Sequence, residues 1–435
     1  MRSIFSKYSR TVTLLILLLF TATGFAQSNT VEFTVDGLKV ILRQTQKETL
    51  VMCMYFKGGS ANYSSADAGI ESLALSGMIE CGTKKYSAND FNDQIDEYGL
   101  HLYGDAANDY GIVKLGCIST YTNEAWKLFS SAIASPAFET QKFNLLKEQK
   151  INELKAGLSN PDVRLKRLAE EFAFASTPYA INPEGTVSSL ADLSREEVKD
   201  YYYNTLLNKN RMFLVVAGNI SRENLEKKIK DAFSEIPAKE YKPANIESPF
   251  FSHETSKIES RQIATNYVSG ILNAPDLDSP DYPAFRLAIS ILNSALFEVI
   301  RLSKHLSYAP SASMSEGRIS YATMYASTSQ PVETVSAMRS VLSYMKNETY
   351  TDELIENVRK HLLISYIRQQ EVMSDIVDEL GKAEIIGDWK LAENLGARMN
   401  NVTAKEIKKV MNTYAKNITW AYIGEPGLGK QSFNQ

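Results

Sequence analysis

The same order of strands and helices is predicted twice in this chain, at a spacing of about 210 residues. The first copy has a hairpin at 31–44, a strand at 49–59, two helices from Ala68, two strands at 100–120 and two helices that end near Leu158. The second copy has a strand at 261–271, a helix at 281–296, two strands at 306–330 and two helices at 333–370. A repeat of this length and order predicts a duplicated α+β domain.

The segment 236–251 separates the two copies. It contains three prolines and has no hydrophobic periodicity, which is typical of a domain boundary. We therefore predict an N-terminal domain at 27–240 and a homologous C-terminal domain at 241–435.

The first 26 residues are predicted to be a secretory signal peptide. A basic start with Arg2, Lys7 and Arg10 precedes a short apolar run at 12–20 and small residues that end at Ala26. Cleavage after Ala26 would place the mature chain in the periplasm, with no stable membrane anchor. An uncleaved anchor is the alternative, although the apolar run is short for a transmembrane helix.

Composition and charge exclude several classes of protein. The chain is 44% hydrophobic and 23% charged, which is typical of a globular protein and not of a disordered or membrane-spanning one. Loss of the three cations in the signal peptide changes the formal net charge from -4 to -7, so the mature chain has no electrostatic reason to bind nucleic acid. The three cysteines do not support a disulfide framework, and we expect Cys53 and Cys117 to be buried thiols.

Three stretches together resemble one protein family. They are 69–83, which ends in Gly-Thr, STPYAINPEGT at 176–186, and LFEVIRLSKHLSYAPSA at 296–312. Their order and spacing resemble the insulinase/pitrilysin family of zinc metallopeptidases, in its two-domain, mitochondrial-processing-peptidase-like branch. The resemblance covers nearly the whole mature chain. It implies an α+β fold of two duplicated domains, each an antiparallel-rich sheet packed against helices, which together form half of a clamshell.

Active members of that family carry H-x-x-E-H on the helix at 69–83. Two histidines at i and i+4 share one helix face and bind one zinc ion, and the glutamate between them activates a water molecule. Counting forward from the start of the stretch, these positions are Ser72, Leu75 and Ser76. Counting back from its end, they are Leu73, Ser76 and Gly77. Neither register contains a zinc ligand or a general base.

No other residues replace the missing ligands. The four histidines are each more than fifty residues from the next, so no two of them can share a helix face: His101, His253, His305 and His361. The resemblance places the family's downstream metal-ligand glutamate at Glu153, which we interpret as a solvated or hydrogen-bonded helix residue. We expect no metal and no cofactor in this chain, and no autonomous peptidase activity.

The resemblance also assigns a pair of residues in the second domain. In the family, an arginine and a tyrosine seven residues apart reach the active cleft, and the corresponding residues here are Arg301 and Tyr308. A tyrosine hydroxyl can donate a hydrogen bond to a developing oxyanion, and an arginine can hold a substrate backbone. A surface cation at a helix end and an ordinary strand tyrosine are the alternative interpretation.

Some insulinase-family enzymes consist of one subunit that carries the zinc motif and a partner that supplies the arginine and tyrosine. The sequence has the pattern of the second kind. We therefore expect a zinc-bearing partner subunit and a peptide or unfolded polypeptide as substrate. The alternative is a non-catalytic peptide-binding or scaffolding protein that retains the fold. An independent hydrolase with a displaced site is a third possibility, which the scarcity of histidines disfavours.

Other motifs give no competing chemistry. The sequence contains no G-x-S-x-G elbow. The segment GEPGLGK at 424–430 lacks the full spacing of a phosphate-binding loop, and we expect it to be a C-terminal tail.

Overall fold

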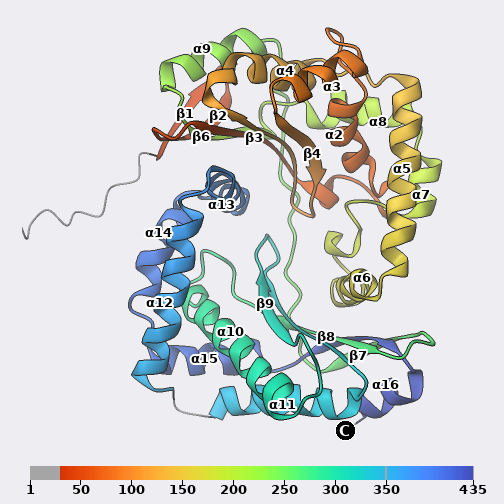
Figure 1. Ribbon diagram of the computed structural model, residues 1–435, viewed down its shortest axis with the longest axis vertical. Coiled ribbons are helices and arrows are strands. Elements are labelled where there is room, and N and C mark those ends of the chain that lie inside the picture. The colour runs from red at the N-terminus through yellow and green to blue at the C-terminus, as the bar shows by residue number, and fades with distance from the viewer. Residues whose placement is uncertain (1–29, 348–349, 435) are drawn as a thin grey trace, which may run out of the picture.

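The computed structural model describes residues 30–347 and 350–434, which form two β-sheets packed against helices (Figure 1). A six-stranded sheet belongs to the N-terminal domain and a five-stranded sheet to the C-terminal domain. The expected α+β class with two such domains is confirmed. The predicted signal peptide, residues 1–26, lies outside the described residues.

The first sheet is built around one completely buried strand, β6. In spatial order its strands are β1 (Thr30–Val35), β2 (Leu38–Gln44), β6 (Met212–Gly218), β3 (Thr49–Lys57), β5 (Tyr110–Ile118) and β4 (His101–Ala106). The turn between β1 and β2 has φ values of 46° at Asp36 and 85° at Gly37. Two left-handed residues are typical of a type I′ hairpin turn, which explains the Asp-Gly pair.

The second sheet repeats the first but has, among its described strands, none that corresponds to β1. Its order is β7 (Thr255–Ser260), β11 (Thr419–Gly424), β8 (Asn266–Asn273), β10 (Tyr321–Thr328) and β9 (Ser311–Ser315). Each sheet has one parallel pair among its described strands, β2 with β6 and β7 with β11. The remaining pairs are antiparallel. The order and direction of five strands are therefore duplicated.

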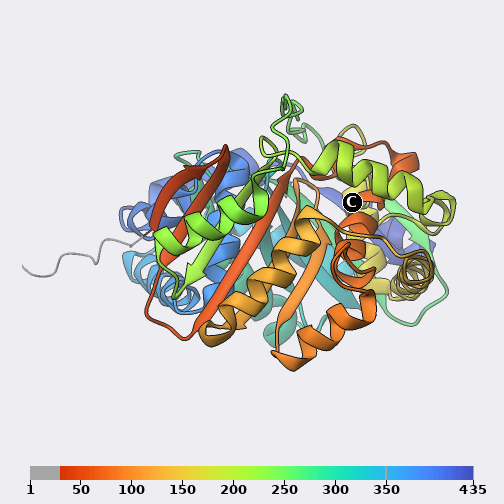
Figure 2. The same ribbon diagram turned by 90° about the horizontal axis from the view of Figure 1, so that it is seen from above.

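Helices pack against both sheets. Those of the N-terminal domain are α2 (Ile70–Glu80), α3 (Ala88–Glu97), α4 (Thr122–Ala134), α5 (Thr140–Ser159), α6 (Pro161–Ala173), α7 (Val187–Asp192), α8 (Arg195–Tyr201) and α9 (Arg222–Phe233). Those of the C-terminal domain are α10 (Tyr282–Leu296), α11 (Pro331–Asn347), α12 (Asp352–Gln369), α13 (Met373–Ile386), α14 (Lys390–Met399), α15 (Ala404–Tyr414) and α16 (Pro426–Phe433). Figure 2 shows α4 in orange and α9 in green lying across the first sheet.

The two domains exchange one helix each. Helix α13 of the C-terminal domain packs against β3 and β6, and helix α6 of the N-terminal domain packs against β8 and β11 (Figure 1). The buried side chains of Val377 and Leu380 on α13 join Tyr55 and Phe213 in one hydrophobic core. Since each fully buried large apolar side chain contributes roughly 1.5–3 kcal/mol, this exchange holds the two domains together as one body.

The contact between α13 and β3 is unusually close. A Cβ atom at Gly381 would lie 2.1 Å from the Tyr55 ring, so only glycine fits there. The Tyr55 hydroxyl donates a hydrogen bond to the Val377 carbonyl at 3.2 Å. On the neighbouring strand β5, the Lys114 ammonium forms an ion pair with Asp378 at 2.7 Å, and the lysine side chain is only 5% exposed.

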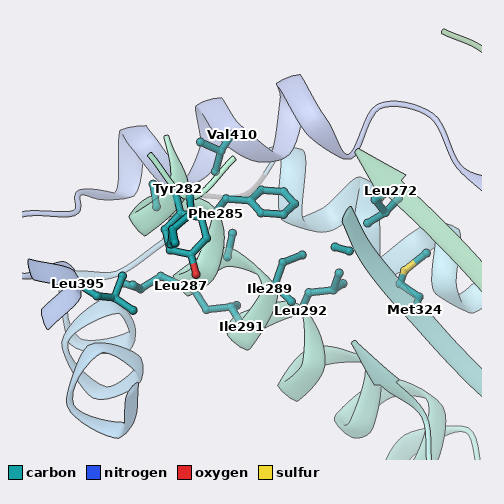
Figure 3. Packing of buried hydrophobic residues seen from close by; sticks show 14 of the residues in the cluster. Leu272, Tyr282, Phe285, Leu287, Ile289, Ile291, Leu292, Met324, Leu395 and Val410 are labelled. Atoms are coloured by element: carbon teal, nitrogen blue, oxygen red, sulfur yellow. The ribbon is translucent and has the colours of Figure 1, made fainter. Parts of the chain in front are cut away.

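Helix α10 is the central helix of the C-terminal core. Figure 3 shows its residues Phe285 and Leu292 among side chains that include Leu272 of β8, Met324 of β10 and Val410 of α15. The continuous helix Tyr282–Ser303 is long and apolar enough to cross a membrane by length and composition. However, 56% of its most apolar window is buried inside the protein, and a core helix meets the same two criteria.

The expectation of a tail at 424–430 is wrong. These residues lead into α16, whose N-terminus is capped by the Glu425 carboxylate, which accepts hydrogen bonds from the N–H groups of Gly427 (2.8 Å) and Leu428 (2.6 Å). The Phe433 ring packs against Trp420. Capping and packing thus stabilise a helix that its glycines disfavour.

Two other expectations concern the connection between the domains and the cysteines. Residues 237–254, which overlap the predicted boundary segment 236–251, contain no helix or strand. Cys53, Cys81 and Cys117 are all buried free thiols, which confirms the expectation for Cys53 and Cys117.

Candidate functional site

The chain contains a cleft of about 700 Å³ between its two domains. Its walls come from the turn between β4 and β5, from α5 and α6, from the loop at 179–184, and from the β9–β10 hairpin. Charged side chains of both signs line it: Asp109, Lys150, Glu153, Arg164, Lys166, Arg167, Glu170, Glu184 and Glu316. A cleft of this size, with polar and apolar walls, can accommodate a peptide segment.

Helix α2, which carries the degenerate motif, lies beside this cleft and packs against β4, α5 and α8. Ser72 is fully buried, and its hydroxyl donates to Glu184 at 2.9 Å. The hydroxyl of Ser76 donates to the Gly104 carbonyl of β4 at 3.4 Å, and Leu75 is fully buried. Gly77, a position of the other register, lies against Phe138 in the core. Of these positions, Ser72 contacts a residue that lines the cleft, Glu184.

The residues around these positions do not fit a zinc ion. Zinc needs thiolate, imidazole or carboxylate ligands, whereas α2 presents two neutral hydroxyls and a hydrocarbon side chain. Glu184 is engaged by Ser72 and by the ammonium of Lys150 at 3.4 Å. Glu153 is exposed on α5 and accepts a hydrogen bond from Gln149 at 3.1 Å. Within residues 30–347 and 350–434, no three His, Cys, Asp or Glu side chains are arranged to hold a metal ion.

We expect the purified mature chain to contain no stoichiometric zinc, because neither register of α2 supplies a ligand. Elemental analysis after dialysis against a weak chelator measures this, with a metallopeptidase that carries H-x-x-E-H as the positive control. About one tightly bound zinc ion per chain would contradict the assignment of α2.

The sequence analysis missed two neighbouring carboxylates, Asp105 of β4 and Glu184 of the cleft wall. Partial desolvation, followed by the negative charge of Glu184, raises the pKa of Asp105. Lys150 opposes this rise because its positive charge favours the ionised carboxylate. Two carboxylates thus share the positive charge of one lysine, Lys150, which forms its ion pair with Glu184.

Glu71 is another buried acid that the sequence analysis missed. It precedes Ser72, is fully buried, and accepts hydrogen bonds from the Tyr201 hydroxyl at 2.6 Å and the Asn62 amide at 3.1 Å. Burial raises the pKa of Glu71, although these donors oppose the rise. An acidic residue within an otherwise apolar helix was the signal in the sequence. Its partners lie on other elements, so its role is to join α2 to α8.

Tyr179 lines the cleft and joins the β4–β5 turn to the β9–β10 hairpin. Its hydroxyl donates to the Asp109 carboxylate in the β4–β5 turn and accepts from the backbone N–H of Ile319 at 3.0 Å. The same carboxylate accepts from the N–H of Arg318 at 2.9 Å. Burial raises the pKa of Asp109, and the hydrogen bond from Tyr179 opposes the rise. The family-like loop at 176–186 therefore contributes to packing between the domains.

The structure brings Arg301 and Tyr308 together, and neither residue lines the cleft. The Arg301 guanidinium lies 4.2 Å from the centre of the Tyr308 ring and 4.8 Å from that of Phe297. Tyr308 is 78% exposed, and Arg301 is half-buried. Among the described residues, neither the guanidinium nor the Tyr308 hydroxyl has a hydrogen-bond or ion-pair partner. Both groups can therefore reach a molecule outside this chain.

Two family models match the sequence. Residues 39–186 match the model of insulinase (peptidase family M16), and residues 192–362 match that of the peptidase M16 inactive domain. Together they extend over most of the chain. The chain belongs to the M16 family. The resemblance seen in the sequence is thus confirmed, and the absence of the zinc motif makes this an inactive-type M16 homologue.

Solved structures show the same fold. A peptidase M16 inactive domain from Pseudomonas fluorescens is 19% identical, with a TM-score of 0.81 over 91% of this chain and 98% of that chain. The periplasmic protease PqqL from Escherichia coli is 13% identical, with a TM-score of 0.76 over 92% of this M16 chain but 47% of that chain. A chain of complex III from Candida albicans is also 13% identical, with a TM-score of 0.76 over 91% of this chain and 95% of that chain. No curated protein sequence matches this M16 chain.

Proposed function

We propose that this chain is the zinc-less subunit of an exported heterodimeric M16 peptidase, which assists peptide cleavage at the zinc site of a partner chain. The proposal is carried by the contrast between the zinc-motif positions on α2 and the pair of Arg301 and Tyr308. The serines on α2 are buried and hydrogen-bonded within the chain, whereas the donors of Arg301 and Tyr308 have no hydrogen-bond or ion-pair partner among the described residues. Such donors serve a catalytic role only if another molecule supplies the reacting groups.

The size of the chain supports a partner. It superposes on about half of the PqqL protease, so a complete clamshell of that kind needs a second unit of similar length. The likeness to a chain of complex III, a multisubunit assembly, is in line with a fold that works within complexes. The predicted signal peptide adds that the assembly would operate in the periplasm.

The chemistry of the pair suits amide cleavage. The Tyr308 hydroxyl can donate to a carbonyl oxygen as it becomes negatively charged, and the Arg301 guanidinium can hold the peptide backbone. Zinc in the partner would activate the water that attacks the amide. This chain would contribute binding and charge stabilisation, but no general base.

Co-purification of a tagged mature chain from its native host tests the proposal. We expect a second M16 chain of similar length with H-x-x-E-H, and peptide cleavage that requires both chains. Recovery of the tagged chain as a homo-oligomer, or full cleavage activity of the zinc chain alone, would contradict the proposal.

A non-catalytic peptide-binding protein is the second candidate, and the cleft of about 700 Å³ favours it. In that case the chain would bind unfolded segments between its domains without any effect on their hydrolysis. Peptide binding by the isolated chain, together with unchanged cleavage by the zinc chain, would support this function over the first.

A further inference from the structure

The guanidinium of Arg301 contacts a second aromatic ring besides that of Tyr308, the ring of Phe297. Phe297 and Arg301 lie four residues apart in η6 (Phe297–Ser303), a π-helical extension of α10. The guanidinium is within 5 Å of both ring centres, at 4.8 Å for Phe297 and 4.2 Å for Tyr308. Both distances are inside the range of an attractive cation–π contact, which extends to about 6 Å. π-Helical turns are frequent at functional sites.

Arg301 differs from other half-buried arginines of the chain. Arg164 pairs with Glu171 and Glu259, and Arg286 pairs with Glu316. In the part of the chain that the structure describes, the Arg301 guanidinium has aromatic rings as its only partners. Rings bind the face of a guanidinium and leave its in-plane N–H donors available for a carbonyl or carboxylate group.

The backbone of Arg301 is also held, by a contact of its carbonyl oxygen with His305. His305 has a left-handed conformation with φ of 54°, and its Nδ1 atom lies 3.1 Å from the Arg301 carbonyl oxygen. The π-helix ends at this point, because a left-handed residue reverses the direction of the chain. The arginine is thereby held at its carbonyl by His305 and at its guanidinium by two rings.

We propose that Phe297 is a positioning residue for Arg301, which keeps the guanidinium in one orientation with its N–H donors ready for a peptide carbonyl or carboxylate of the substrate. The inference rests on the proposed function of the Arg301–Tyr308 pair and adds a third residue to it. Phe297 itself acts through the arginine. Pre-orientation removes part of the entropy that a free arginine side chain would lose when it binds.

The first test requires no partner and no activity. In the mature chain labelled with ¹⁵N-arginine, the Arg301 Nε–H signal is assigned by its absence from the Arg301→Lys variant. We expect ring currents to shift this signal upfield in the wild type. The shift should shrink in Phe297→Leu, which keeps an apolar side chain without a ring, and should persist in Phe297→Tyr. An unchanged Arg301 signal in Phe297→Leu would overturn the proposal.

The second test uses the complex with the zinc chain. Loss of one exposed cation–π contact should raise the KM for a peptide substrate roughly 2–5-fold in Phe297→Leu, with kcat within a factor of about two. Phe297→Tyr should restore the wild-type KM. A wild-type KM in Phe297→Leu, while Arg301→Ala weakens binding, would remove the positioning role. Unchanged kinetics in Arg301→Ala would instead remove the proposed function, and the Arg301 Nε–H signal would still report whether Phe297 orders the guanidinium.

Discussion

Replacement of Tyr308 by phenylalanine should lower the turnover of the assembled peptidase by roughly 10²–10³, the usual effect of losing one oxyanion donor. The substitution removes one hydroxyl and keeps the ring that lies against Arg301, so the cation–π contact should survive. Because Tyr308 is 78% exposed, the stability of the chain should not change. A peptide-cleavage assay on the reconstituted complex measures the effect, with the zinc chain alone as the baseline.

Arg301→Ala is the matched variant for this measurement. It should act in the same direction, with a larger share of the loss in KM because the guanidinium holds the substrate. If both groups serve one contact, the double variant should lose less than the two single losses combined. Wild-type turnover of Tyr308→Phe in a fully assembled complex would leave the chain with a scaffolding function only.

Replacement of Asp378 by alanine should lower the free energy of unfolding by roughly 1–3 kcal/mol, between the costs of breaking an exposed and a buried ion pair, because the Asp378 side chain is 37% exposed. The Lys114 side chain is 5% exposed, and its other contact is the Ser374 carbonyl at 3.4 Å. Without the carboxylate, the ammonium would remain in the interface between β5 and α13 with no counter-charge. Urea unfolding followed by circular dichroism measures the loss.

The replacement of Lys114 by methionine provides the control. Methionine has a similar length and no charge, so the double variant Lys114→Met/Asp378→Ala should recover most of the lost stability. If Asp378→Ala alone costs less than about 0.5 kcal/mol, the effect is that of an ordinary surface substitution, and the pair does not secure α13.

Local patterns in the sequence predicted the elements well where the periodicity was clear. The Asp36-Gly37 turn, the buried strand β3 and the long helix α5 all occur where the sequence indicates them. The placement of β6 and β11 at the parallel pairs was not predicted, because pairing between distant strands leaves no local signal. The helix α16 was missed because its glycines suggest a loop, while its stability comes from Glu425 and Trp420.

The candidate site was predictable only in part. The family resemblance placed the degenerate positions on α2 in two alternative registers, and the contacts of Ser72 with Glu184 and of Gly77 with Phe138 could not be predicted from the sequence. Spacing alone gave Arg301 and Tyr308 as a pair. The contribution of Phe297 depends on a π-helical turn, whose geometry hydrophobic periodicity does not reveal.

The exchange of α6 and α13 has a consequence for the synthesis of the chain. The inner face of the first sheet, which includes Tyr55 and Phe213, is complete once β6 has been made, but its cover contains Val377 and Leu380 of α13. At a typical rate of translation, the ribosome takes roughly 10–30 s to synthesise the residues between β6 and the end of α13. During this interval an apolar sheet face is open to water. The nascent N-terminal domain would therefore depend on a chaperone, or remain incompletely folded, until the second half of the chain has emerged.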